Sequence, residues 1–335
     1  MMRYLRTLLT LFLVALIGYG ALSAQNIQYK MQTIGNHEDE VLGVFVNEDN
    51  TRVATCSLDE SIKIWSLPDG KELKILRGHL GQVNNLSFSG NDKMLASGSA
   101  DNTVRIWDVE SGNQVKVLRG HTDQVIGVYY SQDDESAFVA STSFDKTVKL
   151  WDAKLGVEVK TLRGHTEVTN NVAYSYDGKF IASCSDDKTI KIWSTDLTSR
   201  QPIMTLTGHK APVLTVLFSF DSKKIASSDQ SGEINIWEMP SGKEIRRIKA
   251  HSELVQDVSF AEDNKTLVSA SLDKFVKLWN IETGENIFSM DTGVEVWSVD
   301  LVSDASIIVI GCADGSVRFL NKVKEVKQPK KKGKK

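Results

Sequence analysis

Histidines and tryptophans recur along the chain at nearly constant intervals, and this rhythm restricts the possible folds more than any other feature. The six histidines are 42 to 44 residues apart, at His37, His79, His121, His165, His209 and His251. Six of the seven tryptophans keep the same rhythm, at Trp65, Trp107, Trp151, Trp193, Trp237 and Trp279. A unit of this length cannot bury its apolar side chains alone, so the units must stack against one another.

Each repeat has the pattern of four short β-strands. In the second unit, residues 83–88 alternate and are rich in strand-forming side chains, and an apolar strand, 94–99, follows a polar turn. A turn with an aspartate leads to a third strand, 103–107, and a glycine turn then leads to a fourth. No segment after residue 24 has a helical period, so the chain is predicted to be all-β.

Two segments show the family that these repeats resemble. They are RGHLGQVNNLSFSGNDKMLASGSADNTVRIWDVESG and RGHTEVTNNVAYSYDGKFIASCSDDKTIKIWS. The combination of Gly-His, Trp-Asp and a period of about 40–45 residues is similar to the WD40 family, and the resemblance covers residues 27–320. It implies a seven-bladed β-propeller of four-stranded antiparallel blades.

The seventh unit is degenerate. Segment 314–320 matches the third strand of the other units, and the histidine and tryptophan positions fall on Thr292 and Leu320. This unit lacks a fourth strand, but residues 27–37 match one at the other end of the chain. We therefore predict that the N-terminal strand pairs in the last blade and closes the ring, in a propeller that spans residues 25–321.

The resemblance implies a hydrogen-bonded tetrad of histidine, serine, aspartate and tryptophan inside each blade. Such a chain of bonds satisfies a buried imidazole, hydroxyl and indole N–H together. In the fifth unit Ser231 stands at the aspartate position, so Asp229 is the alternative partner for His209 and Trp237. Five complete sets are predicted: His37, Ser57, Asp59, Trp65; His79, Ser99, Asp101, Trp107; His121, Ser143, Asp145, Trp151; His165, Ser185, Asp187, Trp193; and His251, Ser271, Asp273, Trp279.

Recurrence of the set argues against catalysis. A Ser-His-Asp hydrolase triad occurs once, in a cleft, whereas this set occurs five times and includes a tryptophan. A ring would distribute the histidines among separate blades, which argues against a metal site. No cofactor motif is present. The sequence therefore predicts no enzyme, cofactor or small-molecule substrate, and it shows no separate cluster of acids for a site in the central funnel.

In the family that the chain resembles, partners often dock on the face that carries the aspartate turns. Three positions in each blade would point there, and many are apolar in this chain. An exposed apolar patch usually marks a protein interface, unless its side chains pack between blades. Trp297, the only tryptophan outside the rhythm, belongs to the predicted partner-binding residues: Leu42, Leu58, Ile126, Phe144, Val168, Leu214, Leu254, Leu272 and Trp297.

Residues 1–24 have the pattern of a secretory signal peptide. Arg3 and Arg6 precede an apolar run from Leu8 to Ile17, and small residues follow up to Ala24. Cleavage after Ala24 predicts an exported protein, either periplasmic or secreted. The alternative is an uncleaved membrane anchor, although the run is shorter than the roughly 20 residues that span a bilayer. The three cysteines occupy matching strands of different repeats, so we expect buried thiols rather than disulfides.

The charge is unevenly distributed. The last fifteen residues contain eight lysines and one glutamate, whereas residues 25–320 contain 30 basic and 42 acidic residues. An acidic body argues against a nucleic-acid surface on the folded part. The tail 322–335 is predicted to be disordered, as a solubility tail or as a tether to anionic lipid or polyanion through Lys330, Lys331, Lys332, Lys334 and Lys335. The leading interpretation is a non-catalytic protein-binding scaffold.

Overall fold

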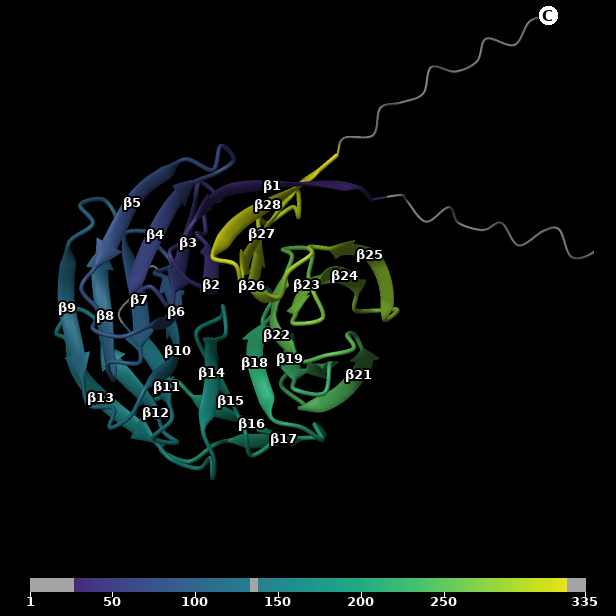
Figure 1. The fold of residues 1–335 in the computed structure, drawn as a ribbon. Helices are drawn as coiled ribbons and strands as arrows, with labels where there is room; N and C mark the ends of the chain where they lie inside the picture. Colours follow the sequence, from purple (N-terminus) through teal and green to yellow (C-terminus); the bar gives the residue numbers. More distant parts are fainter. Residues whose placement is uncertain (1–26, 133–137, 324–335) are drawn as a thin grey trace, which may run out of the picture.

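The computed structural model describes residues 27–132 and 138–323, and every regular element in these ranges is a β-strand. The predicted signal peptide and the five tail lysines lie outside the described residues. No helix in the described ranges is long and apolar enough to cross a membrane. The strands form antiparallel sheets arranged as a ring (Figure 1).

Blades one to four each consist of four consecutive strands, which follow one another from the innermost to the outermost position. Blade one contains β2 (Val41–Val46), β3 (Arg52–Ser57), β4 (Ser61–Ser66) and β5 (Glu72–Arg77). Blade two contains β6 (Val83–Phe88), β7 (Met94–Ser99), β8 (Thr103–Asp108) and β9 (Gln114–Arg119). Blade three contains β10 (Val125–Tyr130), β11 (Phe138–Ser143), β12 (Val148–Asp152) and β13 (Val157–Leu162). Blade four contains β14 (Thr169–Tyr174), β15 (Phe180–Ser185), β16 (Thr189–Ser194) and β17 (Met204–Thr207).

The last three blades complete the ring. Blade five contains β18 (Val213–Phe218), β19 (Lys224–Asp229), β20 (Glu233–Glu238) and β21 (Lys243–Lys249). Blade six contains β22 (Val255–Phe260), β23 (Thr266–Ser271), β24 (Phe275–Asn280) and β25 (Glu285–Asp291). Blade seven contains β26 (Val296–Leu301), β27 (Ile307–Cys312), β28 (Ser316–Lys322) and β1 (Tyr29–Asn36). The prediction of seven four-stranded blades is confirmed.

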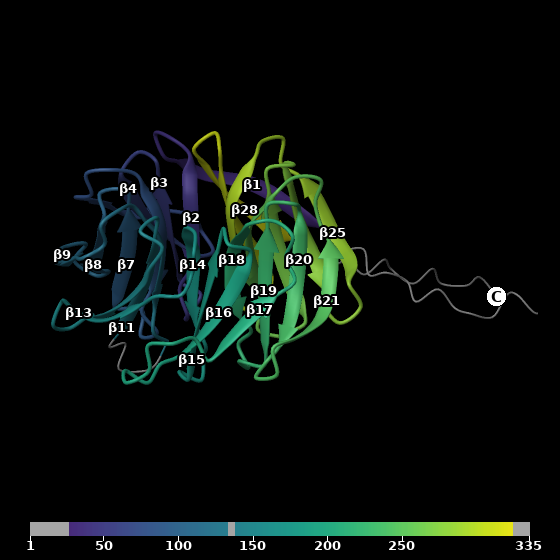
Figure 2. The ribbon, with the colours of Figure 1, turned by 90° about the horizontal axis from the view of Figure 1, so that it is seen from below.

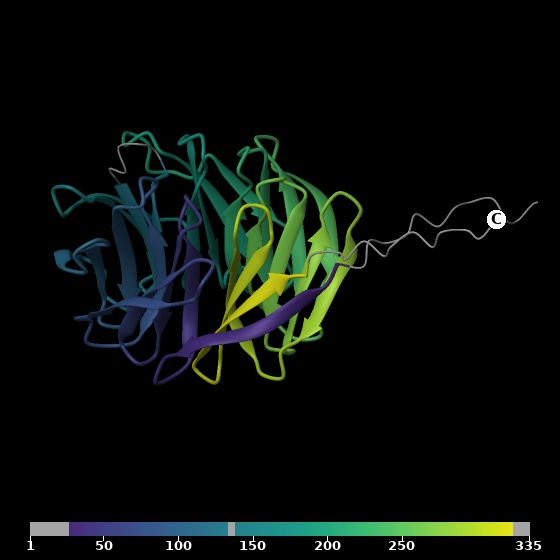
Figure 3. The same ribbon diagram turned by 90° about the horizontal axis from the view of Figure 1, so that it is seen from above.

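The N-terminal strand closes the ring. β1 pairs antiparallel with β28, from Tyr29 opposite Lys322 to Asn36 opposite Ser316, and the two strands lie side by side (Figure 3). The Tyr29 hydroxyl also donates a hydrogen bond to the carbonyl of Ala305 in blade seven. Blade seven therefore joins segments from both ends of the chain, as the sequence predicted.

The innermost strand of each blade packs against the innermost strands of both neighbours, so these seven strands surround a central channel. Strands run across the thickness of the disc between two faces (Figure 2). We define the top face as the one on which the innermost strands begin and the aspartate turns lie. The bottom face carries the loops that join the innermost strand of each blade to the next strand.

The apolar core lies between neighbouring blades rather than inside any one of them. One cluster joins Val41, Val53 and Trp65 of blade one to Val309 and Phe319 of blade seven. Each sheet is buried on both sides, which explains why strands such as β27 are apolar throughout. The three cysteines are fully buried and unpaired in this core, in agreement with the prediction of buried thiols: Cys56, Cys184 and Cys312.

Candidate protein-binding surface and central channel

Hydrogen-bonded tetrads connect the top turns of the blades to their strands. In blade four the indole N–H of Trp193 donates to the Ser183 hydroxyl at 2.9 Å. The same hydroxyl lies 2.9 Å from His165 Nε2, and His165 Nδ1 lies 2.8 Å from the Asp187 carboxylate. A carboxylate only accepts hydrogen bonds, so Nδ1 carries the hydrogen and Nε2 accepts the hydroxyl hydrogen. Every polar group of this buried chain is thereby satisfied.

Six blades contain this arrangement. The bonds between histidine and aspartate span 2.7–2.9 Å, and the hydroxyl is within 2.7–2.9 Å of both rings. The sets are His37, Thr55, Asp59, Trp65; His79, Ser97, Asp101, Trp107; His121, Ser141, Asp145, Trp151; His165, Ser183, Asp187, Trp193; His209, Ser227, Asp229, Trp237; and His251, Ser269, Asp273, Trp279.

The prediction of the tetrad serines is wrong, because none of the predicted serines joins its histidine to its tryptophan. The hydroxyl that does so lies two residues earlier on the same strand. Ser185 instead accepts a hydrogen bond from the backbone N–H of Asp187 and donates to the carbonyl of Glu167, which fixes the turn. Residues two apart on a strand point to the same side, so the two hydroxyls look equivalent in the sequence. The misassigned residues are Ser57, Ser99, Ser143, Ser185 and Ser271.

Blades five and seven depart from the repeat in different ways. In blade five Asp229 binds His209, as the alternative pairing predicted, but Trp237 donates to Ser227 instead. This tetrad is therefore complete, with its carboxylate two residues earlier than in the other blades. In blade seven the guanidinium of Arg318 donates to Asp314, and to the carbonyl of Thr292, which holds the top turn in place.

Burial lowers the pKa of the imidazoles of His37, His79 and His251, and the aspartates that they contact also have lowered pKa values. Burial lowers the pKa of His251 to about 4, despite the opposing effect of Asp273. Burial alone would raise the pKa of Asp59, but hydrogen bonds from Ser61 and the backbone of Glu38 outweigh it and lower that pKa to about 2. Although the order of hydroxyl, imidazole and carboxylate matches a hydrolase triad, the hydroxyls are fully buried. The tetrads therefore have a structural role.

The predicted partner-binding residues stand where the innermost strands begin and at the aspartate turns. Phe144 is 40% exposed, and the other eight are partly exposed, so none is fully buried. Glu40 lies in this region as well, and burial, Asp39 and Glu295 raise its pKa. The edge of the channel on the top face, here called the top rim, therefore combines apolar side chains with acidic ones.

Leu80 is a surface residue that the repeat pattern did not predict as part of the binding face. It is 82% exposed and directly follows His79 on the top face. The corresponding positions of the other repeats hold Glu38, Thr122, Thr166, Lys210, Ser252 and Gly293. A leucine at a position where the other repeats have no large apolar side chain could have identified this exposed residue from the sequence.

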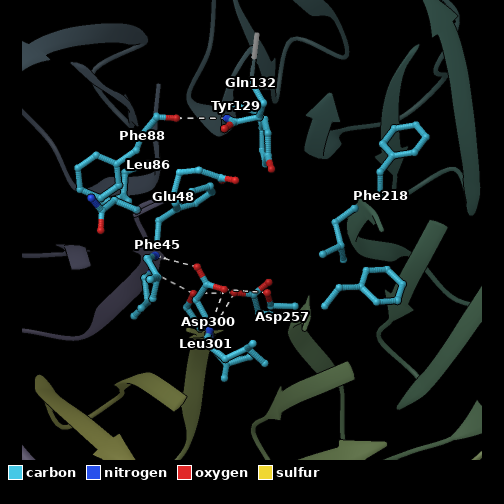
Figure 4. Close-up of a pocket in the computed structure, with 18 of the residues that line it drawn as sticks. Phe45, Glu48, Leu86, Phe88, Tyr129, Gln132, Phe218, Asp257, Asp300 and Leu301 are labelled. Carbon is cyan, nitrogen blue, oxygen red and sulfur yellow. Dashed lines mark hydrogen bonds between the residues drawn. The ribbon is translucent and has the colours of Figure 1, made fainter. Parts of the chain in front are cut away.

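A cavity of about 410 Å³ lies at the bottom end of the channel (Figure 4). One part of its wall is aromatic, with Phe45 and Tyr129 from the innermost strands and Tyr176 and Phe220 from the bottom loops. Carboxylates also line it: Glu48, Asp49, Asp92, Asp257, Glu262 and Asp300. The expectation that no cluster of acids occupies the funnel is therefore wrong. The carboxylates come from different repeats, and only the packing of neighbouring innermost strands brings them together.

Comparison with known families agrees with this geometry. The family model described as WD domain, G-beta repeat matches residues 28–66, 70–108, 112–152, 156–194, 200–238 and 242–280. The chain belongs to the WD40 family. A search of curated proteins gave no match. Each matched WD40 repeat begins in the outermost strand of one blade and continues through three strands of the next. The first repeat therefore bridges blades seven and one, and most of blade seven lies beyond the six matched stretches.

Proposed function

We propose that this WD40 propeller is a non-catalytic scaffold that captures protein partners on its top face. WD40 propellers are generally protein-interaction platforms, which supports the class of function. The observation that carries the assignment of the face is the ring of nine apolar residues, all partly exposed around one end of the channel. Exposed Leu80 extends the apolar surface beyond this ring.

The composition of the rim indicates the kind of partner. Phe144 and Trp297 can contribute large contact areas, and aromatic residues are enriched among interface hot spots. Carboxylates such as Glu40 and Glu295 would favour basic side chains on the partner and increase the rate of encounter. We therefore expect the partner to present apolar side chains flanked by lysine or arginine.

The proposed setting is outside the cytoplasm. It rests on the leader pattern of residues 1–24, with Arg3 and Arg6 before an apolar run that ends in small residues. N-terminal sequencing of the protein isolated from its native host should show Gln25 as the first residue. An intact Met1 would favour the anchored form instead.

A second candidate function is a tether that acts through the lysine-rich tail. Eight lysines among the last fifteen residues would bind anionic lipid or another polyanion at low ionic strength. Deletion of residues 322–335 should then abolish retention on heparin and on anionic vesicles. Unchanged retention would remove this candidate and leave the scaffold proposal unaffected.

A matched pair of triple variants tests the top face. The test variant replaces Phe144, Leu272 and Trp297 with alanine. The control replaces Leu73, Val115 and Val157, which are 43%, 45% and 48% exposed on the outermost strands of blades one to three. A photo-crosslinking residue at Ile126 would first identify the partner by mass spectrometry.

Binding of the purified partner is then measured for both variants by calorimetry. The test variant should lose about 2 kcal/mol or more of binding free energy, since buried aromatic anchors reach this range. Its thermal midpoint should stay near that of the wild type. Equal affinity of the two variants would refute the assignment of the top face.

A further inference from the structure

The cavity at the bottom of the channel carries a separate inference, because its wall combines two kinds of group that favour the same ligand chemistry. We propose that this cavity binds an organic cation with an alkylammonium group, either a free polyamine or a lysine side chain of another protein. The site lies at the opposite end of the channel from the top face. It goes beyond the proposed scaffold function and does not depend on it.

Arg52 acts electrostatically on Asp49, but Asp257, Asp300 and Glu48 form no ion pair with a basic side chain in the described part of the chain. Asp257 on β22 and Asp300 on β26 lie next to each other, and Glu48 extends toward the open space (Figure 4). Among the lining residues none is a lysine, arginine or histidine. Buried charges in proteins are normally paired with an opposite charge, so a bound cation would supply the missing partner.

Both half-buried aspartates, Asp257 and Asp300, are held in fixed positions. Asp257 accepts hydrogen bonds from the Ser298 hydroxyl at 2.6 Å and from the backbone N–H of Val299 at 3.1 Å. Asp300 accepts from the Ser259 hydroxyl at 2.7 Å and from the backbone N–H of Val46 at 2.7 Å. Each aspartate is thus tied to a neighbouring blade. Preorganised carboxylates bind a cation without a further cost of ordering.

Aromatic rings line another part of the wall. Phe45 and Tyr129 are in an edge-to-face contact with centroids 5.8 Å apart, and Tyr176 stacks on Phe220 at 4.6 Å. Aromatic faces attract ammonium groups through their quadrupole, and they cover the methylene groups of an alkyl chain. Leu217 adds to this apolar surface. The wall therefore suits a cation with an apolar stem.

A metal ion fits the site less well. Within the described ranges no three or more histidine, cysteine, aspartate or glutamate side chains are placed to hold a metal ion together. Divalent metals such as calcium need six or more oxygen ligands at short distances, whereas this cavity is wide and partly aromatic. Its volume of about 410 Å³ is within the usual range for sites that bind small organic ligands.

The titration of the aspartates adds a second measurable consequence. Burial raises the pKa of Asp257 to about 7, with Asp300 acting in the same direction, and burial raises the pKa of Asp300 to about 6, with Glu48 adding to it. Glu262, Tyr129 and Tyr176 also line the cavity, and no basic group does. A bound ammonium group favours the ionised carboxylates, so binding near pH 6.5 should release protons.

Calorimetry with two probes tests the proposal. The probes are spermidine and the peptide acetyl-Lys-Lys-Lys-amide, titrated into the purified protein and into a form that ends at residue 323, whose own tail lysines cannot compete. We expect one-to-one binding of at least one probe, with proton release at pH 6.5 in buffers of different ionisation enthalpy. Binding of spermidine alone indicates a free polyamine, and binding of the peptide alone indicates a lysine side chain. Binding of neither probe would overturn the proposal.

Exposed residues that line the cavity, which we call its mouth, can be replaced without disturbing the fold. Replacement of Glu48 and Glu262, both exposed, with glutamine should weaken binding roughly tenfold to a hundredfold, as expected for the loss of charge-assisted contacts. The control replaces the exposed top-face acids Glu60 and Glu253 with glutamine, which changes the net charge equally. Asp257→Asn tests the interior of the cavity.

Equal affinities of the mouth and control variants would show that the amines bind elsewhere on the acidic surface, and the proposal would fail. The top-face triple variant should bind amines like the wild type. Failure of the cavity proposal is therefore distinguishable from failure of the scaffold proposal.

Discussion

Replacement of Ser183 with alanine should destabilise the propeller far more than replacement of Ser185, although the two serines lie on the same strand and are both fully buried. The Ser183 hydroxyl contacts both His165 Nε2 and Trp193 Nε1. Its loss leaves two buried polar groups without a partner, at about 1–3 kcal/mol each. We therefore expect a loss of about 4 kcal/mol in the free energy of unfolding.

Ser185 makes weaker and more accessible contacts. It accepts from the N–H of Asp187 and donates to the carbonyl of Glu167 at 3.3 Å, and both of these partner residues are at least partly exposed on the top face, so their backbone groups can bond to water when the hydroxyl is lost. A net loss of about 1 kcal/mol is expected for Ser185→Ala. Ser183→Thr is the matched control, because Thr55 supplies the same hydroxyl in blade one.

Urea unfolding, followed by tryptophan fluorescence and circular dichroism, measures these differences. The two signals must coincide before the free energies are compared, because a ring of blades can unfold in stages. Ser183→Thr should retain most of the wild-type stability. If Ser183→Ala and Ser185→Ala were equally stable, or if Ser185→Ala were the weaker protein, the corrected assignment of the tetrad hydroxyl would be refuted.

Three further predictions concern single positions. Gly315→Ala should lower the free energy of unfolding by about 2 kcal/mol, because Gly315 has a φ of +78° and a Cβ there would lie 2.9 Å from the carbonyl oxygen of His37. Gly178→Ala, at a φ of +69° with nothing within 4 Å of the added Cβ, should lower it by only about 1 kcal/mol, and equal midpoints of the two variants in urea would contradict this. Asp229→Ala should destabilise blade five about as much as Asp187→Ala destabilises blade four, and an Asp229→Ala protein of wild-type stability would show that the shifted tetrad contributes nothing. The stability of the wild type relative to Asp257→Asn should fall as the pH rises from about 5 to about 8. Protonated Asp257 stabilises the fold fully below its unfolded pKa of about 4, and this contribution is lost as the pH rises through its folded pKa of about 7. A difference in urea unfolding between the two proteins that stays constant with pH would contradict the prediction.

The repeat rhythm was sufficient to predict the blades, because each blade needs the same buried residues at the same positions. His37 and Trp65 mark blade one as clearly as His251 and Trp279 mark blade six. Even blade seven, which has Thr292 and Leu320 in place of the repeated histidine and tryptophan, was predicted from the match of its third strand and from the absence of a fourth strand at the C-terminal end of the repeat region. Ring closure followed from that gap, since an exposed strand edge is unfavourable.

Features that depend on two segments at once were harder to predict. Lys63 and Lys277 each donate to the carbonyl of the residue that precedes the histidine of their blade, at 2.8 and 2.7 Å. Blade five has Asn235 at the same position, and Arg247 from the neighbouring strand donates to the carbonyl of Gly208 instead. No single repeat contains the information that one residue replaces the other.

The acidic cavity is a similar case. Asp257 and Asp300 stand at different positions of two innermost strands, so aligning the repeats separates them. Only the ring geometry brings them together with Glu48 at one end of the channel. Sequence patterns identify what every blade shares, whereas sites built from the differences between blades require the assembled structure.

Amide hydrogen exchange of β1 shows directly whether the N-terminal strand closes the ring in solution. We expect the amides of residues 29–36 that pair with β28 to be protected about as well as those of the outermost strands of the other blades, such as β5 and β9. Rapid, unprotected exchange throughout residues 29–36, with the other outermost strands still protected, would contradict closure by the N-terminal strand.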